Sequence, residues 1–217
     1  MAQVQILYLA TAGGLVQLGS PGTSGRWRPV GDALAGQDVL AVRASATDPL
    51  HAFAGAASGL HATLDGGASW ELQRSEMVTA LAAALDGTMF AGTSGGTILQ
   101  GGPGEWTEAH TGAAAVVRLT VLADGRIAAV YKNGEVEFLT DGQWIASTLV
   151  VPCASEVVSS VAQPHEIYIT SETSLVTRSG TRAIDEKPTG ALVLLSGKPE
   201  VLLVGTRGLL QRSDDAC

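Results

Sequence analysis

The sequence has few charged residues, and most of them are acidic. Charged residues make up 16% of the 217 residues, against about 25% in an average soluble domain. There are 13 Lys and Arg against 21 Asp and Glu, which gives a formal net charge of -8. Because proteins bind nucleic acid mainly by neutralising phosphates with basic side chains, this balance disfavours a nucleic-acid partner.

Long apolar runs and cysteines are also scarce. No apolar run approaches the ~20 residues of a membrane-spanning helix, and the start MAQVQILYLATAGG lacks the basic region of a secretory signal. Cys153 and Cys217 are too few for a disulfide framework. We therefore expect a cytoplasmic protein that begins at its mature N-terminus and does not insert directly into a membrane.

Glycine and apolar residues, by contrast, are plentiful. There are 27 glycines without a strict period of three, which excludes a collagen-like helix, and 46% of the residues are apolar, which excludes a disordered polymer. Gly, Pro, Asp-Gly or Asn-Gly interrupts the chain every eight to twelve residues, so helical patterns are short. Even the alanine-rich segment 78–87 is predicted as a strand from its place in the repeat described next.

Six hairpin-like segments recur along the chain, each with an apolar strand, a turn of small residues and a second strand. They read ILYLATAGGLVQL, HAFAGAASGLHAT, TMFAGTSGGTILQ, IAAVYKNGEVEFL, IYITSETSLVTR and VLLVGTRGLLQR. The residues that open the second strands are spaced by 45, 37, 38, 40 and 34 positions. A period of roughly 40 residues is typical of a four-stranded propeller blade.

An apolar segment precedes five of these hairpins, and a tryptophan follows four of them. The apolar segments, such as DVLAVRAS and VVRLTVLA, suit a buried inner strand. The tryptophans are predicted to lie on outer strands and to pack between blades: Trp27, Trp70, Trp106 and Trp144. Each repeat is therefore predicted as inner strand, hairpin and outer strand.

We predict an all-β fold in which residues 1–217 form a single β-propeller domain of about six four-stranded blades. The blades cover approximately residues 1–36, 37–75, 76–114, 115–153, 154–189 and 190–217. The terminal blades are incomplete: the first lacks its inner strand and the last its outer strand, so 22 strands are expected instead of 24. In a five-blade alternative, the segment ALVLLSG completes the first blade instead.

One turn carries a recognisable motif. Residues 63–70 read TLDGGASW, in which Thr63, Asp65, Gly67 and Trp70 match the pattern Ser/Thr-x-Asp-x-Gly-x-Ser/Thr-Trp. Thr63 and Asp65 can accept hydrogen bonds from the amides of their own loop, and Trp70 opens the outer strand. Residues 140–144, TDGQW, keep a shortened form, and SDDAC at 213–217 aligns Ser213 and Asp215 with the start of the motif.

The motif resembles the Asp-box, or BNR, repeat of β-propellers, which share their blade architecture with WD40-like repeats. This family includes sialidases, sortilin-type receptors and photosystem II assembly-factor-like proteins. Resemblance to sialidases implies an Arg-Ile-Pro segment near the start and a Tyr-Glu pair. The early arginines here lie in RWRPV, residues 26–30, and no Tyr-Glu pair is assigned among Tyr8, Tyr131 and Tyr168. We therefore expect a noncatalytic member.

Metal chemistry has little support in the sequence. The four histidines, His51, His61, His110 and His165, occupy different repeat positions, although His51 and His61 flank one hairpin. We interpret them as single surface or loop residues and Cys153 as a small buried residue. No cofactor and no metal site is predicted.

Three carboxylates occupy equivalent positions immediately before inner strands: Asp38, Glu76 and Glu156. Inner strands begin on one rim of a propeller, so these groups are candidates for binding a cation or a basic group of a partner. The alternative is that they are solvated strand starts. Ala115 and Gly190 occupy the same position in two other repeats.

The function that remains is protein–protein interaction. We expect a scaffold or accessory subunit that binds a protein partner, or a second copy of itself, through its rim and loops. The resemblance to assembly factors implies association with a larger, membrane-embedded complex. The alternative is a glycan-binding or sialidase-like propeller, for which tryptophans exposed to solvent would be the sign.

Overall fold

The structure, a computed structural model, describes residues 5–20, 26–163, 166–177, 180–184, 188–195, 201–206 and 209–213. These residues form 22 β-strands in six antiparallel sheets. The described part of the chain contains no helix with the length and apolarity that a membrane crossing requires. We number the sheets 1 to 6 in chain order.

Sheets 1 to 3 belong to a first compact unit, Met1–Thr111. Sheet 1 has three strands, β1 (Gln5–Thr11), β2 (Gly14–Ser20) and β3 (Arg28–Ala33). Sheet 2 has β4 (Val39–Ala44), β5 (Ala52–Ala56), β6 (Gly59–Thr63) and β7 (Glu71–Arg74). Sheet 3 has β8 (Val78–Ala83), β9 (Met89–Thr93), β10 (Thr97–Gly102) and β11 (Glu105–Thr111).

Sheets 4 to 6 belong to a second unit, Gly112–Cys217. Sheet 4 has β12 (Val116–Val121), β13 (Ile127–Tyr131), β14 (Glu135–Thr140) and β15 (Gln143–Val150). Sheet 5 has β16 (Glu156–Ser159), β17 (Ile167–Thr170), β18 (Ser174–Thr177) and β19 (Gly180–Ala183). Sheet 6 has β20 (Pro188–Leu195), β21 (Val201–Thr206) and β22 (Leu209–Ser213).

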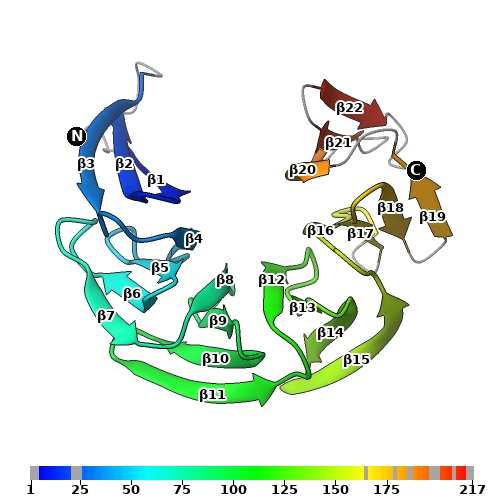
Figure 1. Ribbon diagram of the computed structural model, residues 1–217, viewed down its shortest axis with the longest axis horizontal. Helices are drawn as coiled ribbons and strands as arrows, with labels where there is room; N and C mark the ends of the chain where they lie inside the picture. Colours follow the sequence, from blue (N-terminus) through cyan, green and yellow to red (C-terminus); the bar gives the residue numbers. More distant parts are fainter. Residues whose placement is uncertain are drawn as a thin grey trace. The chain divides into compact units, whose positions relative to one another are not determined.

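The strands pair in chain order within every sheet (Figure 1). The predicted unit of inner strand, hairpin and outer strand is confirmed in sheets 2 to 5, and the alanine-rich segment 78–87 supplies inner strand β8. β20, which begins before the expected boundary at residue 190, pairs with β21 in a sheet of its own. The choice between five and six blades, which depends on whether this segment also completes the first blade, stays a prediction.

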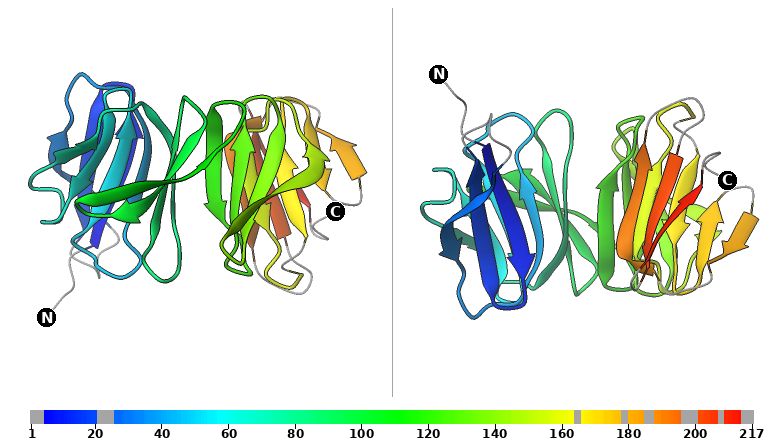
Figure 2. Two further views of the ribbon diagram at one scale, coloured as in Figure 1. Left: turned by 90° about the horizontal axis from the view of Figure 1, so that it is seen from below. Right: turned by 90° about the horizontal axis from the view of Figure 1, so that it is seen from above.

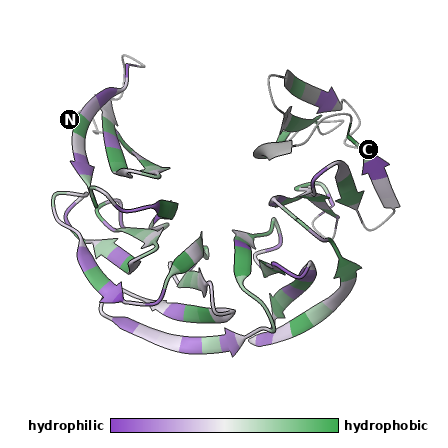
Figure 3. Ribbon diagram, in the orientation of Figure 1, coloured by the Kyte–Doolittle hydropathy of each residue, from purple (hydrophilic) through white to green (hydrophobic). Residues whose placement is uncertain are grey.

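Within each unit, neighbouring sheets lie face to face (Figure 2), and the core lies between them. In the first unit, Phe53 and Leu60 of sheet 2 pack with Leu81 and Met89 of sheet 3. In the second unit, Val130 of sheet 4 belongs to a cluster that also contains residues of sheet 5. The second strands, β5, β9, β13 and β17, are buried along their whole length. Hydropathy follows this layering, because these strands are more apolar than outer strands such as β7 and β11 (Figure 3). Face-to-face packing of small sheets is the arrangement of propeller blades.

Two tryptophans pack between sheets, as predicted. Trp106 of β11 meets Phe53 of sheet 2 edge to face, with 5.6 Å between ring centroids. Trp70, before β7, meets Tyr8 of sheet 1 in the same way at 5.8 Å. The prediction is wrong for Trp27, which is 42% exposed just before β3.

The irregularities of the sheets repeat as well. In sheets 1 to 3, the pairing of the third strand with the outer strand shifts by one residue, which leaves Val30, Gln73 and Ala109 as single-residue bulges. Inner strands β4, β8 and β12 also bulge near their starts. Sheets 2 and 3, which have both bulges, therefore bend at the same two places, since a bulge increases the local twist and bends its strand.

Candidate functional site

The motif loop of residues 63–70 is closed by its own polar side chains. The Gly67 amide donates to Thr63 Oγ1 at 2.8 Å, and Thr63 Oγ1 donates to Asp65 Oδ1 at 2.7 Å. Asp65 also accepts from the Ser69 amide at 3.0 Å and from the Ser69 hydroxyl at 2.6 Å. These bonds from Ser69, followed by the one from Thr63, hold the pKa of Asp65 well below its usual range.

The same loop is fastened to the neighbouring sheet. Buried Gln17, on β2 of sheet 1, donates from Nε2 to the carbonyl of Gly67 at 2.6 Å. Gly67 has a φ of 95°, in the region that favours glycine. A Cβ at this position would come within 2.5 Å of Gln17 Nε2. The loop therefore acts as a structural joint between sheets 1 and 2.

The three predicted rim carboxylates have different surroundings. Glu76 is exposed and pairs with Arg74 at 3.3 Å. Glu156 pairs with Arg118 of β12, whose guanidinium also donates to the Ser155 carbonyl at 2.7 Å. Asp38 is exposed, and its carbonyl accepts from the Ala57 amide.

Two of the three carboxylates thus already have an arginine partner, which weakens their attraction for a cation. Asp38 and Glu76 belong to the first unit and Glu156 to the second. No group of three or more His, Cys, Asp or Glu able to hold a metal occurs among the described residues. The convergence of the three carboxylates stays a prediction.

One histidine corrects the interpretation of all four as surface or loop residues. His61 lies on β6, is only 7% exposed, and has Nε2 2.9 Å from the Ser58 hydroxyl. Burial lowers the pKa of His61, so its neutral form is favoured. His51 lies 3.5 Å from Asp48, and His165 and Cys217 are outside the described residues. Cys153 is exposed, so its interpretation as a buried residue is wrong.

A Tyr-Glu pair does form, contrary to the sequence analysis. The hydroxyl of Tyr131, on β13, donates to Glu137 Oε2, on β14, at 2.6 Å. The two side chains were not assigned because they come from different strands of one hairpin. Tyr131 is 1% exposed, and burial, followed by the charge and hydrogen bond of Glu137, raises its pKa. The raised pKa favours the protonated phenol, which donates this hydrogen bond.

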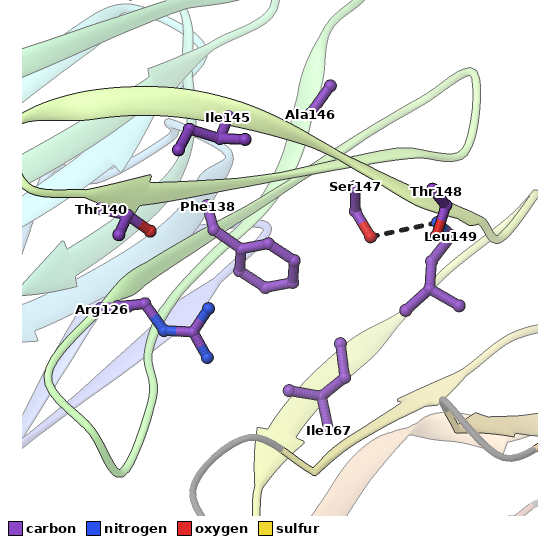
Figure 4. Close-up of a pocket in the computed structure, with 9 residues that line it drawn as sticks. All are labelled: Arg126, Phe138, Thr140, Ile145, Ala146, Ser147, Thr148, Leu149 and Ile167. Atoms are coloured by element: carbon purple, nitrogen blue, oxygen red, sulfur yellow. Dashed lines mark hydrogen bonds between the residues drawn. The ribbon is translucent and has the colours of Figure 1, made fainter.

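A pocket of about 430 Å³ opens in the second unit, against β14, β15 and β17 (Figure 4). Its apolar lining comes from Phe138, Ile145, Leu149 and Ile167, with Ala146 beside them. Arg126 and three hydroxyl residues complete it: Thr140, Ser147 and Thr148. The pocket therefore combines an apolar surface with one cation and several hydroxyl groups.

The pocket coincides with an enlarged form of the repeated bulge. Glu135 of β14 pairs with Val150 of β15, and Glu137 pairs with Ala146. Two steps along β14 therefore correspond to four steps along β15, so β15 contains two extra residues here. The bulged segment, residues 147–149, lines the pocket. The Ser147 hydroxyl accepts from the Leu149 amide at 3.0 Å and compensates for the interrupted ladder. Bulges of this kind are common beside binding sites.

The charge of Arg126 is held in place. Its Nε donates to Asp124 Oδ2 at 2.7 Å, and its guanidinium carbon lies 5.1 Å from the centre of the Phe138 ring. These two contacts fix the guanidinium against the apolar wall of the pocket (Figure 4). The arrangement suits an apolar group that carries a hydrogen-bond acceptor. Sequence patterns gave no sign of it, because the pocket depends on the extra bulge residues.

Comparison with known proteins identifies the fold. No protein-family model matches the sequence, and none of the curated proteins matches it. YCF48 bound to D1 peptide superposes with a TM-score of 0.60 at 15% identity, covering 91% of this chain and 71% of that chain. The Cps50 (Swd1) β-propeller domain of Myceliophteria thermophila gives 0.58 at 15% identity, with 77% and 62% covered.

An ancestral GH74 enzyme gives a TM-score of 0.69 at 14% identity, and 94% of this chain matches 34% of that chain. The chain thus spans about a third of the length of this enzyme. An enzyme and a protein solved with a bound peptide are thus both similar in structure, at identities that show the fold alone. Together with the six sheets, these similarities show that the protein has a β-propeller fold, as the sequence predicts.

Proposed function

We propose that the protein is a noncatalytic interaction scaffold or accessory subunit that binds an extended segment of a partner protein. The observation that carries this proposal is the pocket at the enlarged bulge of sheet 4. Its fixed arginine and its apolar wall suit an apolar side chain flanked by backbone carbonyls or a carboxylate. Such a combination is typical of peptide recognition.

The exposure of the lining supports binding more than stability. Ile145 is 52% exposed although it is a large apolar residue on the pocket wall. An exposed apolar residue next to a concave surface indicates a place where a partner is received. Thr140 and Thr148 offer hydroxyl groups that can bond the backbone of an extended segment.

The proposed family, location and assembly role rest on the resemblance of the motif loop to the Asp-box. The hydrogen-bonded turn at Thr63–Asp65 is the chemistry that the Asp-box requires, and we infer membership of that family from it. YCF48 is a propeller solved with a bound peptide, which is the class of ligand proposed here. We further propose a cytoplasmic location, a single propeller domain over residues 1–217 and a role in the assembly of a larger complex.

Copurification from the native source, followed by mass spectrometry, tests the proposal. The variant Ile145→Asp places a charge on the pocket wall without disturbing the core, because Ile145 is half exposed. Leu72→Asp is the matched control, since Leu72 is 55% exposed on the outer strand of sheet 2. We expect the partner to be retained by Leu72→Asp and lost by Ile145→Asp. Equal retention by both variants would show that the pocket is not the binding site.

One observation favours the alternative of glycan binding. Trp27 is 42% exposed, as an aromatic ring that stacks on a sugar must be. Titration with sialyllactose, followed by tryptophan fluorescence, tests this function directly. A saturable change that disappears in Trp27→Ala would favour glycan binding over the scaffold function, and a flat titration would dismiss it.

A further inference from the structure

The pocket of sheet 4 contains one cation, and the charge of this cation is already balanced. Arg126 donates from Nε to Asp124 Oδ2 at 2.7 Å, and the two side chains are only 30% and 27% exposed. The turn that carries both residues is also closed by the Arg126 amide, which donates to Asp124 Oδ1 at 3.1 Å. The pair therefore offers hydrogen-bond donors to a ligand but adds no net charge to the pocket.

The donors that remain indicate a ligand with several acceptors. Neither Nη group of Arg126 has a hydrogen-bond partner among the residues that the structure describes. The Ser147 hydroxyl accepts from the Leu149 amide, so its own hydrogen is left to be donated. Figure 4 shows Arg126 and Ser147 on either side of the Phe138 ring. A ligand that satisfies both donors brings two acceptors next to an apolar group.

Neutral acceptors suit this pocket better than a carboxylate. A bound carboxylate would share one arginine with Asp124, and the two anions would repel each other. It would also lose hydration against the apolar wall, which costs more free energy for a charged group than for a neutral one. A backbone carbonyl accepts the same hydrogen bonds without adding a charge. The carbonyls of an extended segment are therefore the acceptors that the pocket favours.

The surroundings of the pocket are acidic. Asp141 is exposed, directly follows a residue of the lining and has no ion-pair partner among the described residues. Glu166 directly precedes a lining residue of β17. With Asp124, which contacts the arginine, three carboxylates adjoin a lining that contains a single cation. This imbalance attracts a basic segment and repels an acidic one.

We propose that the pocket binds a basic, extended segment of a partner protein. One aliphatic side chain of this segment packs against Phe138, and its backbone carbonyls accept from Arg126 and Ser147. A Lys or Arg next to the aliphatic residue faces the acidic surroundings, and Asp and Glu are disfavoured at the same positions. This proposal rests on the proposed function, because it specifies the chemistry of the segment that the pocket receives.

A selection from random peptides tests the proposal. The probe is a displayed library of short random peptides, and the full chain is the bait. Ile145→Asp serves for counter-selection, because Ile145 is half exposed on the pocket wall. We expect the peptides that bind the parent chain but not this variant to share an aliphatic residue. Relative to the library, they should be enriched in Lys and Arg beside it and depleted of Asp and Glu.

Two matched variants test the contribution of the acidic surroundings. Asp124→Asn removes a carboxylate beside the pocket, and Asp86→Asn is the control in the corresponding turn of sheet 3. Asp86 accepts from the Thr88 amide at 2.9 Å, as Asp124 accepts from the Arg126 amide, but a threonine stands in place of the arginine. Asn keeps an acceptor oxygen for this turn bond in both variants.

Fluorescence anisotropy then compares a selected peptide with a copy in which Glu replaces its Lys or Arg. The parent chain is expected to prefer the basic peptide. Asp124→Asn should reduce this preference about fivefold, which is the effect of one partly exposed charge pair. Asp86→Asn should leave the preference unchanged.

The outcomes separate this proposal from the proposed function. If no peptide distinguishes the parent chain from Ile145→Asp, the pocket does not receive peptides and both proposals are overturned. If the specific peptides are enriched in Asp or Glu, the basic segment is overturned while the pocket remains the binding site. An equal preference in Asp124→Asn and Asp86→Asn would overturn the selection of basic segments by the acidic surroundings.

Discussion

The outer parts of sheets 2 and 4 use the same turn position for different purposes. In sheet 2 the turn before β7 is a hydrogen-bonded loop that Gln17 joins to sheet 1. In sheet 4 the turn before β15 is short, with positive φ at Asp141 and Gly142. The outer strand of sheet 2 then carries a bulge of one residue, whereas that of sheet 4 carries the larger bulge that lines the pocket.

The difference teaches that the outer edge of a blade can contribute either to stability or to binding. In sheet 2, a buried hydrogen bond joins the turn to sheet 1. In sheet 4, apolar and polar side chains line a pocket that is open to solvent. The inner three strands pair alike in both sheets, with a bulge near the start of the inner strand, so the change is confined to the turn and the outer strand. Substitutions at matched positions can separate the two roles.

The largest difference in stability is expected between glycine substitutions in the two turns. Gly67→Ala should destabilise the fold by about 3 kcal/mol, because its Cβ meets Gln17 and its φ is unfavourable for alanine. Gly142→Ala should cost only about 1 kcal/mol, because that Cβ has no heavy atom within 4 Å. Urea unfolding measures both, and equal losses would refute the joint between sheets 1 and 2.

The next largest loss of stability is expected when the joint between sheets 1 and 2 is broken. Gln17→Ala should destabilise the protein by about 1.5 kcal/mol, because the Gly67 carbonyl loses its buried donor. Gln100→Ala is the control, since Gln100 is exposed on the third strand of sheet 3. The control should change stability by less than about 0.5 kcal/mol. A similar loss in both variants would show that the joint contributes nothing.

A smaller effect on stability is expected at the pocket. Arg126→Met should change unfolding free energy by less than about 1 kcal/mol, because its pair with Asp124 is partly exposed. It should nevertheless weaken binding of the copurified partner about tenfold, by removing a charge-assisted hydrogen bond. Arg74→Met, which breaks the exposed pair with Glu76 in sheet 2, should leave binding unchanged. Unchanged binding by Arg126→Met would contradict the assigned role of the arginine.

The last prediction concerns the pH dependence of stability, which is expected to change in Asp65→Asn. The pKa of Asp65 is lower in the folded state than the ordinary value of about 4, so the folded state binds fewer protons. The stability that the carboxylate contributes is therefore present above pH ~4 and is lost as the pH falls below it. Melting temperatures between pH 6 and pH 3 should fall more steeply for the parent chain than for the variant. Parallel curves would contradict this dependence.

Most of the fold could be predicted from the sequence, because the repeat recurs in the residues themselves. The spacing of the hairpins and the apolar segments before them predicted sheets of inner strand, hairpin and outer strand, including β8 in an alanine-rich segment. Trp70 and Trp106 also pack as expected. Trp27 does not, because the repeat predicts the position of a residue along a strand but not what covers it.

The candidate sites were harder to predict because they depend on pairing between strands. Tyr131 and Glu137 meet only through the register of β13 and β14. The pocket arises where residues 147–149 bulge from β15, and no motif marks that segment. The three candidate rim carboxylates were chosen from repeat position alone, and their convergence stays a prediction. The arginines that pair with two of them were not anticipated.

The bulge on the outer strand has a consequence for variation in chain length. It lies where the outer strand meets the third strand, so residues inserted there leave the register of the inner strands unchanged. Sheets 1 to 3 and sheet 4 already differ in this way, since the outer strand of sheet 4 accommodates a longer insertion. The outer-strand bulge is thus a position at which peptide sequences can be grafted into sheets 1 to 4.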